Sequence, residues 1–230
     1  MKKWQRYLTE RDREILRFAG RYRAFTRDMV HERFFEGQGR ANAVRVLTRL
    51  VRRGLLRRVP FDPPRNYFVP TARGNPTVGF SDFPPRLLTE QSLPVAMAIA
   101  WYCVHAKVER FTNREFRETH PELWCPALKS SCYYRKDTAQ GRKLGLFLID
   151  RGGTPRRIKG KIGRFVWQRK AIPAFADLIR SRRFQITVLT GLASQQDAIA
   201  RKLGGKSYRR VKVQTACIDE LGELLTYRRA

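Results

Sequence analysis

The segment from Thr26 to Arg73 constrains the fold most, because it contains two helix patterns, a short break and then a hairpin pattern. Residues 40–53 repeat apolar side chains at helical spacing with arginines between them, which predicts an amphipathic helix with one cationic face. Its predicted buried stripe is Ala43, Val44, Leu47, Leu50 and Val51. Gly39 precedes the helix and Gly54 follows it, and glycine is typical of the position just after a helix end.

A β-hairpin is predicted directly after this helix. Residues 55–59 and 67–69 are short apolar, β-prone runs, and residues 60–66 between them contain three prolines. Because proline cannot donate a hydrogen bond to a sheet, residues 60–66 should form the tip. Two earlier helices should begin after the capping residues Thr9 and Thr26. This order predicts a winged helix-turn-helix domain over residues 1–73, with the hairpin tip as the wing.

The charge of the chain indicates its partner. The sequence has 48 Lys and Arg against 20 Asp and Glu, a formal net charge of +28 on 230 residues. Such a surface repels itself unless a polyanion neutralises it, so nucleic acid is the expected partner. Residues 1–90 have a net charge of +11 (20 basic, 9 acidic) and residues 91–230 a net charge of +17 (28 basic, 11 acidic). The positive charge is therefore not confined to a basic tag at one end of the chain. The 42% hydrophobic content is enough for packed cores, unlike that of a disordered basic tail.

A second domain is predicted beyond a linker. Residues 74–93 are rich in Gly, Pro, Ser and Asn, which favours a linker there and a second domain over residues 94–230. An all-round apolar helix pattern starts at Pro94, and strand and helix patterns then alternate. The predicted strands are 132–134, 144–149, 184–189 and 211–216, and the predicted helices are 113–118, 174–180, 194–203 and 218–225. The expected fold class is therefore α+β or α/β, a winged helix-turn-helix followed by a small mixed-sheet α/β domain.

Residues 151–170 predict a basic amphipathic helix, with eight Lys and Arg, no acid and interleaved apolar side chains. The residues expected to contact phosphate are Arg156, Arg157, Lys159, Lys161 and Arg164. A solvated basic face and an amphipathic membrane anchor are the alternatives.

Metal, nucleotide and membrane sites are not expected. No run reaches the ~18 apolar residues of a membrane span, and four scattered cysteines predict reduced thiols in a cytoplasmic protein. The nearest set of metal-binding residue types is Cys103, His105, His120, Cys125 and Cys132. That set lacks the paired C-x-x-C spacing of a zinc site, so we expect neither metal nor cofactor. Residues 204–207 resemble the end of a phosphate loop, but Ala200 stands where its first glycine is required.

Several segments resemble the plasmid replication-relaxation family, namely Leu8–Asp12, Leu47–Leu56, Leu148–Thr154 and Val188–Thr190. The resemblance covers most of the chain loosely. It implies a winged helix joined to a degenerate restriction-endonuclease-like domain, whose hallmark is an acidic-x-Asp-Arg-Gly-Thr strand end preceded by a Pro-Asp strand.

The chain departs from both motifs of that family. Lys136-Asp137 stands in place of Pro-Asp, Leu148 replaces the acidic residue, and Gly153 is inserted before Thr154. A nuclease of that fold needs carboxylates that converge on Mg²⁺ or Mn²⁺, and usually a lysine. Asp137 and Asp150 would be those carboxylates if they met on adjacent strands. Leu148 removes a ligand and Asp150 takes the place of the lysine, so we expect no catalytic residues, and Asp150 is as readily part of a strand-ending turn.

The sequence therefore predicts a cytoplasmic, sequence-selective DNA-binding protein that controls replication, transfer or transcription of a plasmid, phage or other mobile element. The residues expected to read base edges are Arg40, Asn42 and Arg45. The residues expected to hold phosphates are Arg49, Arg52, Arg53, Arg57 and Arg58. In the wing, Arg65 and Asn66 are expected to approach a neighbouring groove. The expected partner is double-stranded DNA, with a second copy of the chain and other replication or mobilisation proteins as further candidates. A metal-dependent DNA nuclease and an RNA-binding or ribosome-associated factor are the alternatives.

Overall fold

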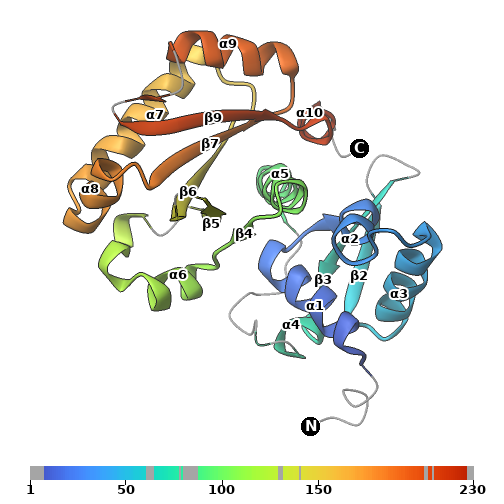
Figure 1. Ribbon diagram of the computed structural model, residues 1–230. Helices are drawn as coiled ribbons and strands as arrows, with labels where there is room; N and C mark the ends of the chain where they lie inside the picture. The colour runs from blue at the N-terminus through green and yellow to red at the C-terminus, as the bar shows by residue number, and fades with distance from the viewer. Residues whose placement is uncertain are drawn as a thin grey trace. The chain divides into compact units, whose positions relative to one another are not determined.

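The protein is a mixed α and β structure with two sheets, shown as a ribbon in Figure 1. The computed structural model describes residues 8–60, 65–77, 79, 88–128, 132–139, 141–204, 207–208 and 210–226. The chain divides into two compact units, residues 1–106 and residues 107–230. One sheet belongs to each unit.

Three helices begin the first unit, α1 (Glu10–Tyr22), α2 (Arg27–Phe34) and α3 (Arg40–Arg52). The Thr9 hydroxyl accepts a hydrogen bond from the backbone N–H of Asp12 at 3.1 Å, and the Asp12 carboxylate accepts from the N–H of Thr9 at 3.1 Å. The Thr26 hydroxyl accepts from the N–H of Met29 at 3.3 Å. Each hydroxyl satisfies a donor that the first turn leaves unpaired. The helix starts predicted at Thr9 and Thr26 are confirmed.

The α3 helix ends as its sequence predicts but does not bury every residue of its apolar stripe. Gly54 follows the C-cap in the left-handed conformation (φ +67°), and its N–H donates to the carbonyl of Val51 at 2.8 Å. That conformation favours glycine, which has no Cβ. Ala43, Leu47 and Leu50 are buried, but Val44 is 43% exposed. The prediction that Val44 is buried was wrong, because 100° per residue places it beyond the edge of the stripe.

The first sheet is antiparallel, in the order β1-β3-β2, and consists of β1 (Phe25–Thr26), β2 (Leu56–Pro60) and β3 (Asn66–Pro70). Strands β2 and β3 form a hairpin whose last pair is Pro60 with Asn66. The hairpin is longer than predicted, so its tip is shorter than 60–66, and residues 61–64 of the expected wing lie outside the described residues.

The described residues of the first unit also form the helices α4 (Gly74–Thr77) and α5 (Ser92–His105). The α5 helix is buried on nearly all sides and packs on α1, α2 and β1. At its end, His105 Nε2 lies 3.1 Å from Glu32 Oε2 on α2. The two units therefore divide after α5 and not within residues 74–93, where we expected the linker. Periodicity shows that such a helix is buried but not which core it enters. Residues 78 and 80–87 of the expected linker lie outside the described ranges.

The second unit contains a mixed sheet in the order β4-β5-β6-β7-β9-β8. Its strands are β4 (Glu109–Arg110), β5 (Tyr133–Thr138), β6 (Gly141–Ile149), β7 (Phe184–Thr190), β8 (Ser207–Tyr208) and β9 (Val211–Cys217). Strands β6, β7 and β9 are parallel, while β4, β5 and β6 pair antiparallel, as does β8 with β9. The predicted mixed α/β arrangement is confirmed. Strands β5 and β6 extend beyond the predicted runs because they form a hairpin.

Helices supply the crossovers between the parallel strands. Helices α7 (Pro155–Lys170) and α8 (Pro173–Arg180) connect β6 to β7, and α9 (Ala193–Leu203) connects β7 to β9. Figure 1 shows the three helices beside β7 and β9. The shared core includes Leu146, Ile162, Phe175, Ile186 and Val213. Further short helices are α6 (Asn113–Thr119), η2 (Pro121–Leu123), η3 (Pro126–Leu128) and α10 (Asp219–Thr226).

Candidate nucleic-acid interface

The solvent-facing side of α3 combines arginines with small side chains. Its exposed residues, called the α3 face below, are Arg40, Ala41, Val44, Arg45, Thr48 and Arg52. They lie opposite the buried stripe of the helix. Residues 37–60 contain seven arginines and no Asp or Glu, so no neighbouring acid in the sequence neutralises this side. The α3 face is therefore cationic, with Ala41, Val44 and Thr48 among its arginines.

The residues predicted to read bases do not share one environment. Arg40 and Arg45 are exposed on the α3 face. Asn42 is half-buried at its edge, and its side-chain amide donates to the Gln38 carbonyl Oε1 at 3.5 Å. Sequence reasoning assigned Val44 to the core. Val44 lies four residues after Arg40 and four residues before Thr48, on the same side of the helix, and this spacing could have indicated the exposed face.

Arg49 connects two helices, which differs from the phosphate contact that the sequence predicts. Its Nη2 donates to Asp12 Oδ1 at 2.6 Å, and the Asp12 side chain is buried. The other Asp12 oxygen accepts the capping hydrogen bond from Thr9. A buried carboxylate needs such partners, because its loss of hydration is otherwise uncompensated. Arg49 therefore holds α3 against α1.

The remaining predicted phosphate contacts lie on α3 and in the hairpin, and the two residues predicted to approach a neighbouring groove, Arg65 and Asn66, lie immediately before and at the start of β3. Arg52, Arg57, Arg58 and Arg65 are exposed, whereas Arg53 and Asn66 are half-buried. Arg57 and Arg58 are neighbours in β2, and successive side chains of a strand point to opposite faces. The two guanidinium groups therefore leave the hairpin on opposite sides and do not form one continuous surface.

A second basic surface lies on α7. The Thr154 hydroxyl caps this helix by accepting from the N–H of Arg157 at 3.3 Å, and Ile158, Ile162 and Val166 are buried. The exposed residues of the opposite side, called the α7 face below, are Arg156, Arg157, Gly160, Arg164 and Trp167. The basic amphipathic helix predicted for this segment is confirmed.

A groove adjoins the start of α7. It has a volume of about 480 Å³ and is lined by Thr154, Pro155, Arg156, Ala198, Arg201 and Lys202. Three of these six side chains are cationic, and two of them come from α9. Lys159 bridges the two helices by donating to the carbonyl of Lys202 at 3.2 Å, and Lys161 is half-buried. Of the predicted α7 contacts, Arg156, Arg157 and Arg164 are thus the most accessible.

One of the eight positive charges of residues 151–170 points inward. Arg169 is fully buried and donates to the Tyr133 hydroxyl at 2.8 and 3.1 Å and to the carbonyl of Phe165 at 3.0 Å. Its guanidinium also lies 5.3 Å from the Tyr133 ring centroid and 5.7 Å from that of Phe175. Burial lowers the pKa of Arg169, since desolvation disfavours the charged form. Arg169 therefore stabilises the core and does not join the α7 face.

The two carboxylates of the alternative nuclease site are far apart. Asp137 pairs in register with Arg142 at the hairpin end of β5 and β6, and Asp150 follows the other end of β6. Eight residues separate Arg142 from Asp150, which is roughly 26 Å along a strand. One metal ion cannot contact both carboxylates, so the expectation that they could meet on adjacent strands was wrong.

Asp150 instead organises a turn after β6. Its buried carboxylate accepts from the N–H of Gly153 at 2.7 Å and from Gln195 Nε2 at 3.0 Å. Asp137 is exposed, with its carboxylate 3.3 Å from Arg142 Nε. Among the described residues, no group of three or more His, Cys, Asp or Glu side chains could hold a metal ion.

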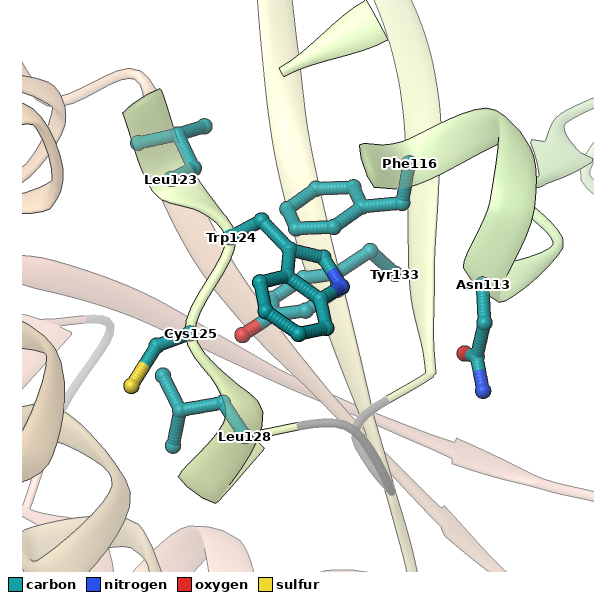
Figure 2. Close-up of a pocket in the computed structure, with 7 residues that line it drawn as sticks. All are labelled: Asn113, Phe116, Leu123, Trp124, Cys125, Leu128 and Tyr133. Atoms are coloured by element: carbon teal, nitrogen blue, oxygen red, sulfur yellow. The ribbon is translucent and has the colours of Figure 1, made fainter. Parts of the chain in front are cut away.

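A small cavity lies between α6, η2, η3 and β5, as Figure 2 shows. It is lined by Asn113, Phe116, Leu123, Trp124, Cys125, Leu128 and Tyr133. Its volume of about 10 Å³ is room for roughly one water molecule, so it cannot admit an organic ligand without rearrangement.

No helix in the described part of the chain is long and apolar enough to cross a membrane. Comparison of the chain with models of protein families, with curated proteins and with solved structures finds no match.

Proposed function

We propose that this protein binds double-stranded DNA with sequence selectivity, using residues 8–70 as a winged helix-turn-helix. The element order supports this proposal, because α1, β1, α2 and α3 precede a hairpin whose strands form a sheet in the order β1-β3-β2. In this proposal α3 is the recognition helix and the β2–β3 hairpin carries the wing.

The observation that carries the proposal is the composition of the α3 face. A helix of 13 residues is about 20 Å long, and the DNA major groove is wide enough to admit an α-helix. Arg40 and Arg45 would donate in pairs to guanine O6 and N7, and the exposed Val44 would contact a thymine methyl group. Arg52 would hold a phosphate, which fixes the position of the helix without reading sequence.

The second unit would add affinity without adding catalysis. We propose that its mixed sheet belongs to a degenerate restriction-endonuclease-like domain, and that Arg156, Arg157 and Arg164 contact phosphates. Together with the resemblance to the plasmid replication-relaxation family, this favours a cytoplasmic role in the replication, transfer or transcription of a plasmid, phage or other mobile element. A second copy of the chain and other replication proteins are candidate partners.

The alternative of a metal-dependent nuclease is less favoured, because Asp137 lies on β5 beside the first residues of β6, whereas Asp150 follows the last residue of β6. The alternative of an RNA-binding factor has no support specific to RNA on the α3 face, which suits a wide major groove. The deep, narrow major groove of an RNA helix excludes such side chains.

The decisive experiment compares two arginines on a selected site and on random duplex. A preferred site is first obtained from a random pool by repeated binding and amplification. Arg45→Ala should then cost about 1–3 kcal/mol on the selected site and little on random duplex, because a base contact is lost. Arg157→Ala should weaken both duplexes and lower the slope of log affinity against log salt by roughly one, because one fewer counterion is released.

Two results would contradict the proposal. Selection that returns no preferred sequence would leave only a non-specific polyanion binder. Equal losses on both duplexes for Arg45→Ala would show that α3 does not read bases, whatever the affinity of the protein for DNA.

A further inference from the structure

Trp167 is the most exposed large hydrophobic side chain among the described residues, at 69%. It projects from the α7 face, one turn beyond Arg164. Exposure of most of an indole to water is unfavourable, since a tryptophan contributes a large apolar area when it is buried. A structural role in the core of its own unit does not explain this position.

Two glycines lie on the helix surface beside Trp167, of which Gly160 is exposed and Gly163 is half-buried. Gly160 and Gly163 lie seven and four residues before it, and a helical side chain leans over the turn that precedes its own Cα. A Cβ at Gly160 would meet no atom within 4 Å, so packing does not require glycine there. Glycine weakens a helix interior and is used where another group approaches the backbone closely. This surface leaves room for a flat group against the indole.

The charges around the indole select the class of ligand. Residues 151–170 contain no acid, and no carboxylate of the described residues forms an ion pair with Arg156, Arg157 or Arg164. The ligand should therefore carry repeated negative charges as well as a flat apolar face. A lipid headgroup carries negative charge but no flat apolar face, and a protein helix does not repeat both features at a regular spacing. A nucleic-acid strand offers both features in every nucleotide.

We propose that the α7 face binds single-stranded nucleic acid, with one base stacked on Trp167 and the neighbouring phosphates held by Arg157 and Arg164. Arg157 and Arg164 are seven residues apart, roughly 10 Å along the helix, so they can hold different phosphates of one strand. An intact duplex hides the faces of its bases within the stack, so a base can stack on the indole only when the strand is open. Stacking of this kind tolerates any base, because every base has a π-face.

The test uses the full chain and labelled twelve-nucleotide oligothymidylate, twelve-nucleotide oligouridylate and a blunt-ended, fully paired DNA duplex. Trp167→Ala should weaken binding to the single strand roughly 5- to 150-fold, the range expected for one lost base stack, and leave duplex binding unchanged. Trp167→Phe should retain most of the affinity. Arg164→Ala should weaken binding to all three and lower the salt slope for the single strand by roughly 0.7. The two oligonucleotides distinguish DNA from RNA as the source of the strand.

Leu192→Ala is the matched control, because Leu192 is 62% exposed in the same unit and lies outside the α7 face. It should change none of the affinities. The proposal would be overturned if Trp167→Ala affected neither oligonucleotide, or if it weakened single-strand and duplex binding alike while its circular dichroism spectrum matched that of the unmodified protein. Failure to select a duplex site for α3 would leave this test unaffected, since it needs no preferred sequence.

Discussion

Arg49→Ala should destabilise the first unit, although Arg49 lies on a helix that we propose to bind DNA. The substitution removes a hydrogen bond of 2.6 Å between its guanidinium and the buried Asp12 carboxylate. A hydrogen bond to a charged group contributes about 1.5–3 kcal/mol, and breaking a fully buried pair costs about 3–5 kcal/mol. Arg49 is 39% exposed, so water can partly replace its guanidinium. We expect a loss of about 2 kcal/mol in the free energy of unfolding.

Urea denaturation followed by circular dichroism measures this loss. Arg52→Ala, on the exposed side of the same helix, is the control and should change stability by less than about 0.5 kcal/mol. The double variant with Asp12→Asn should be about 1–2 kcal/mol more stable than the sum of the single effects predicts, because the two side chains contact each other. In duplex binding we expect the opposite ranking of the two variants, with the larger effect for Arg52→Ala. Arg52→Ala should lower the salt slope by roughly one, and Arg49→Ala should leave it unchanged.

A different pattern would refute the reasoning. If Arg49→Ala left stability unchanged and lowered the salt slope as Arg52→Ala does, the guanidinium would hold a phosphate and the contact with Asp12 would be incidental. Additive effects in the double variant would likewise show that the two residues are not coupled.

Three further predictions concern chemistry, helix stability and pH. Supercoiled plasmid incubated with the protein and Mg²⁺ or Mn²⁺ should stay intact, because Asp137 and Asp150 cannot share a metal ion; nicking that disappears on Asp150→Ala would contradict this. Gly160→Ala should raise the free energy of unfolding by about 0.5–1 kcal/mol in urea denaturation, since its Cβ would meet no atom within 4 Å; a loss of stability would show that packing requires the glycine. Hydrogen bonds from Arg17 and Arg13 lower the pKa of Glu10 below its ordinary value of 4.5. The charged Glu10 therefore stabilises the fold at pH values above 4.5, and this contribution disappears as the pH falls through the lower pKa of the folded state. Glu10→Gln should accordingly be less stable than the unmodified protein at pH 7 and equally stable at pH 2, and a difference that persists at pH 2 would have another cause.

Local sequence determined the helix starts, the end of α3 and the basic side of α7. Thr9 and Thr26 cap helices through groups three residues away, and Gly54 adopts a conformation that other residues rarely take. The apolar period of residues 155–170 identified the buried side of α7 without knowledge of what covers it. These features depend on neighbours within one or two helical turns, so a single sequence contains all the necessary information.

Tertiary structure alone decided which charged residues face solvent. Arg49 contacts a carboxylate 37 residues earlier, and Arg169 contacts a tyrosine hydroxyl 36 residues earlier, so neither could be separated from its exposed neighbours by composition or spacing. The hairpin register placed Asp137, on β5, beside the start of β6 and so far from Asp150, which follows the end of β6. The same limit applies to α5, because its apolar sequence pattern does not indicate which of the two cores the helix enters. Pairing across such distances depends on how whole elements pack, and the periodicity of one segment contains no information about its partner.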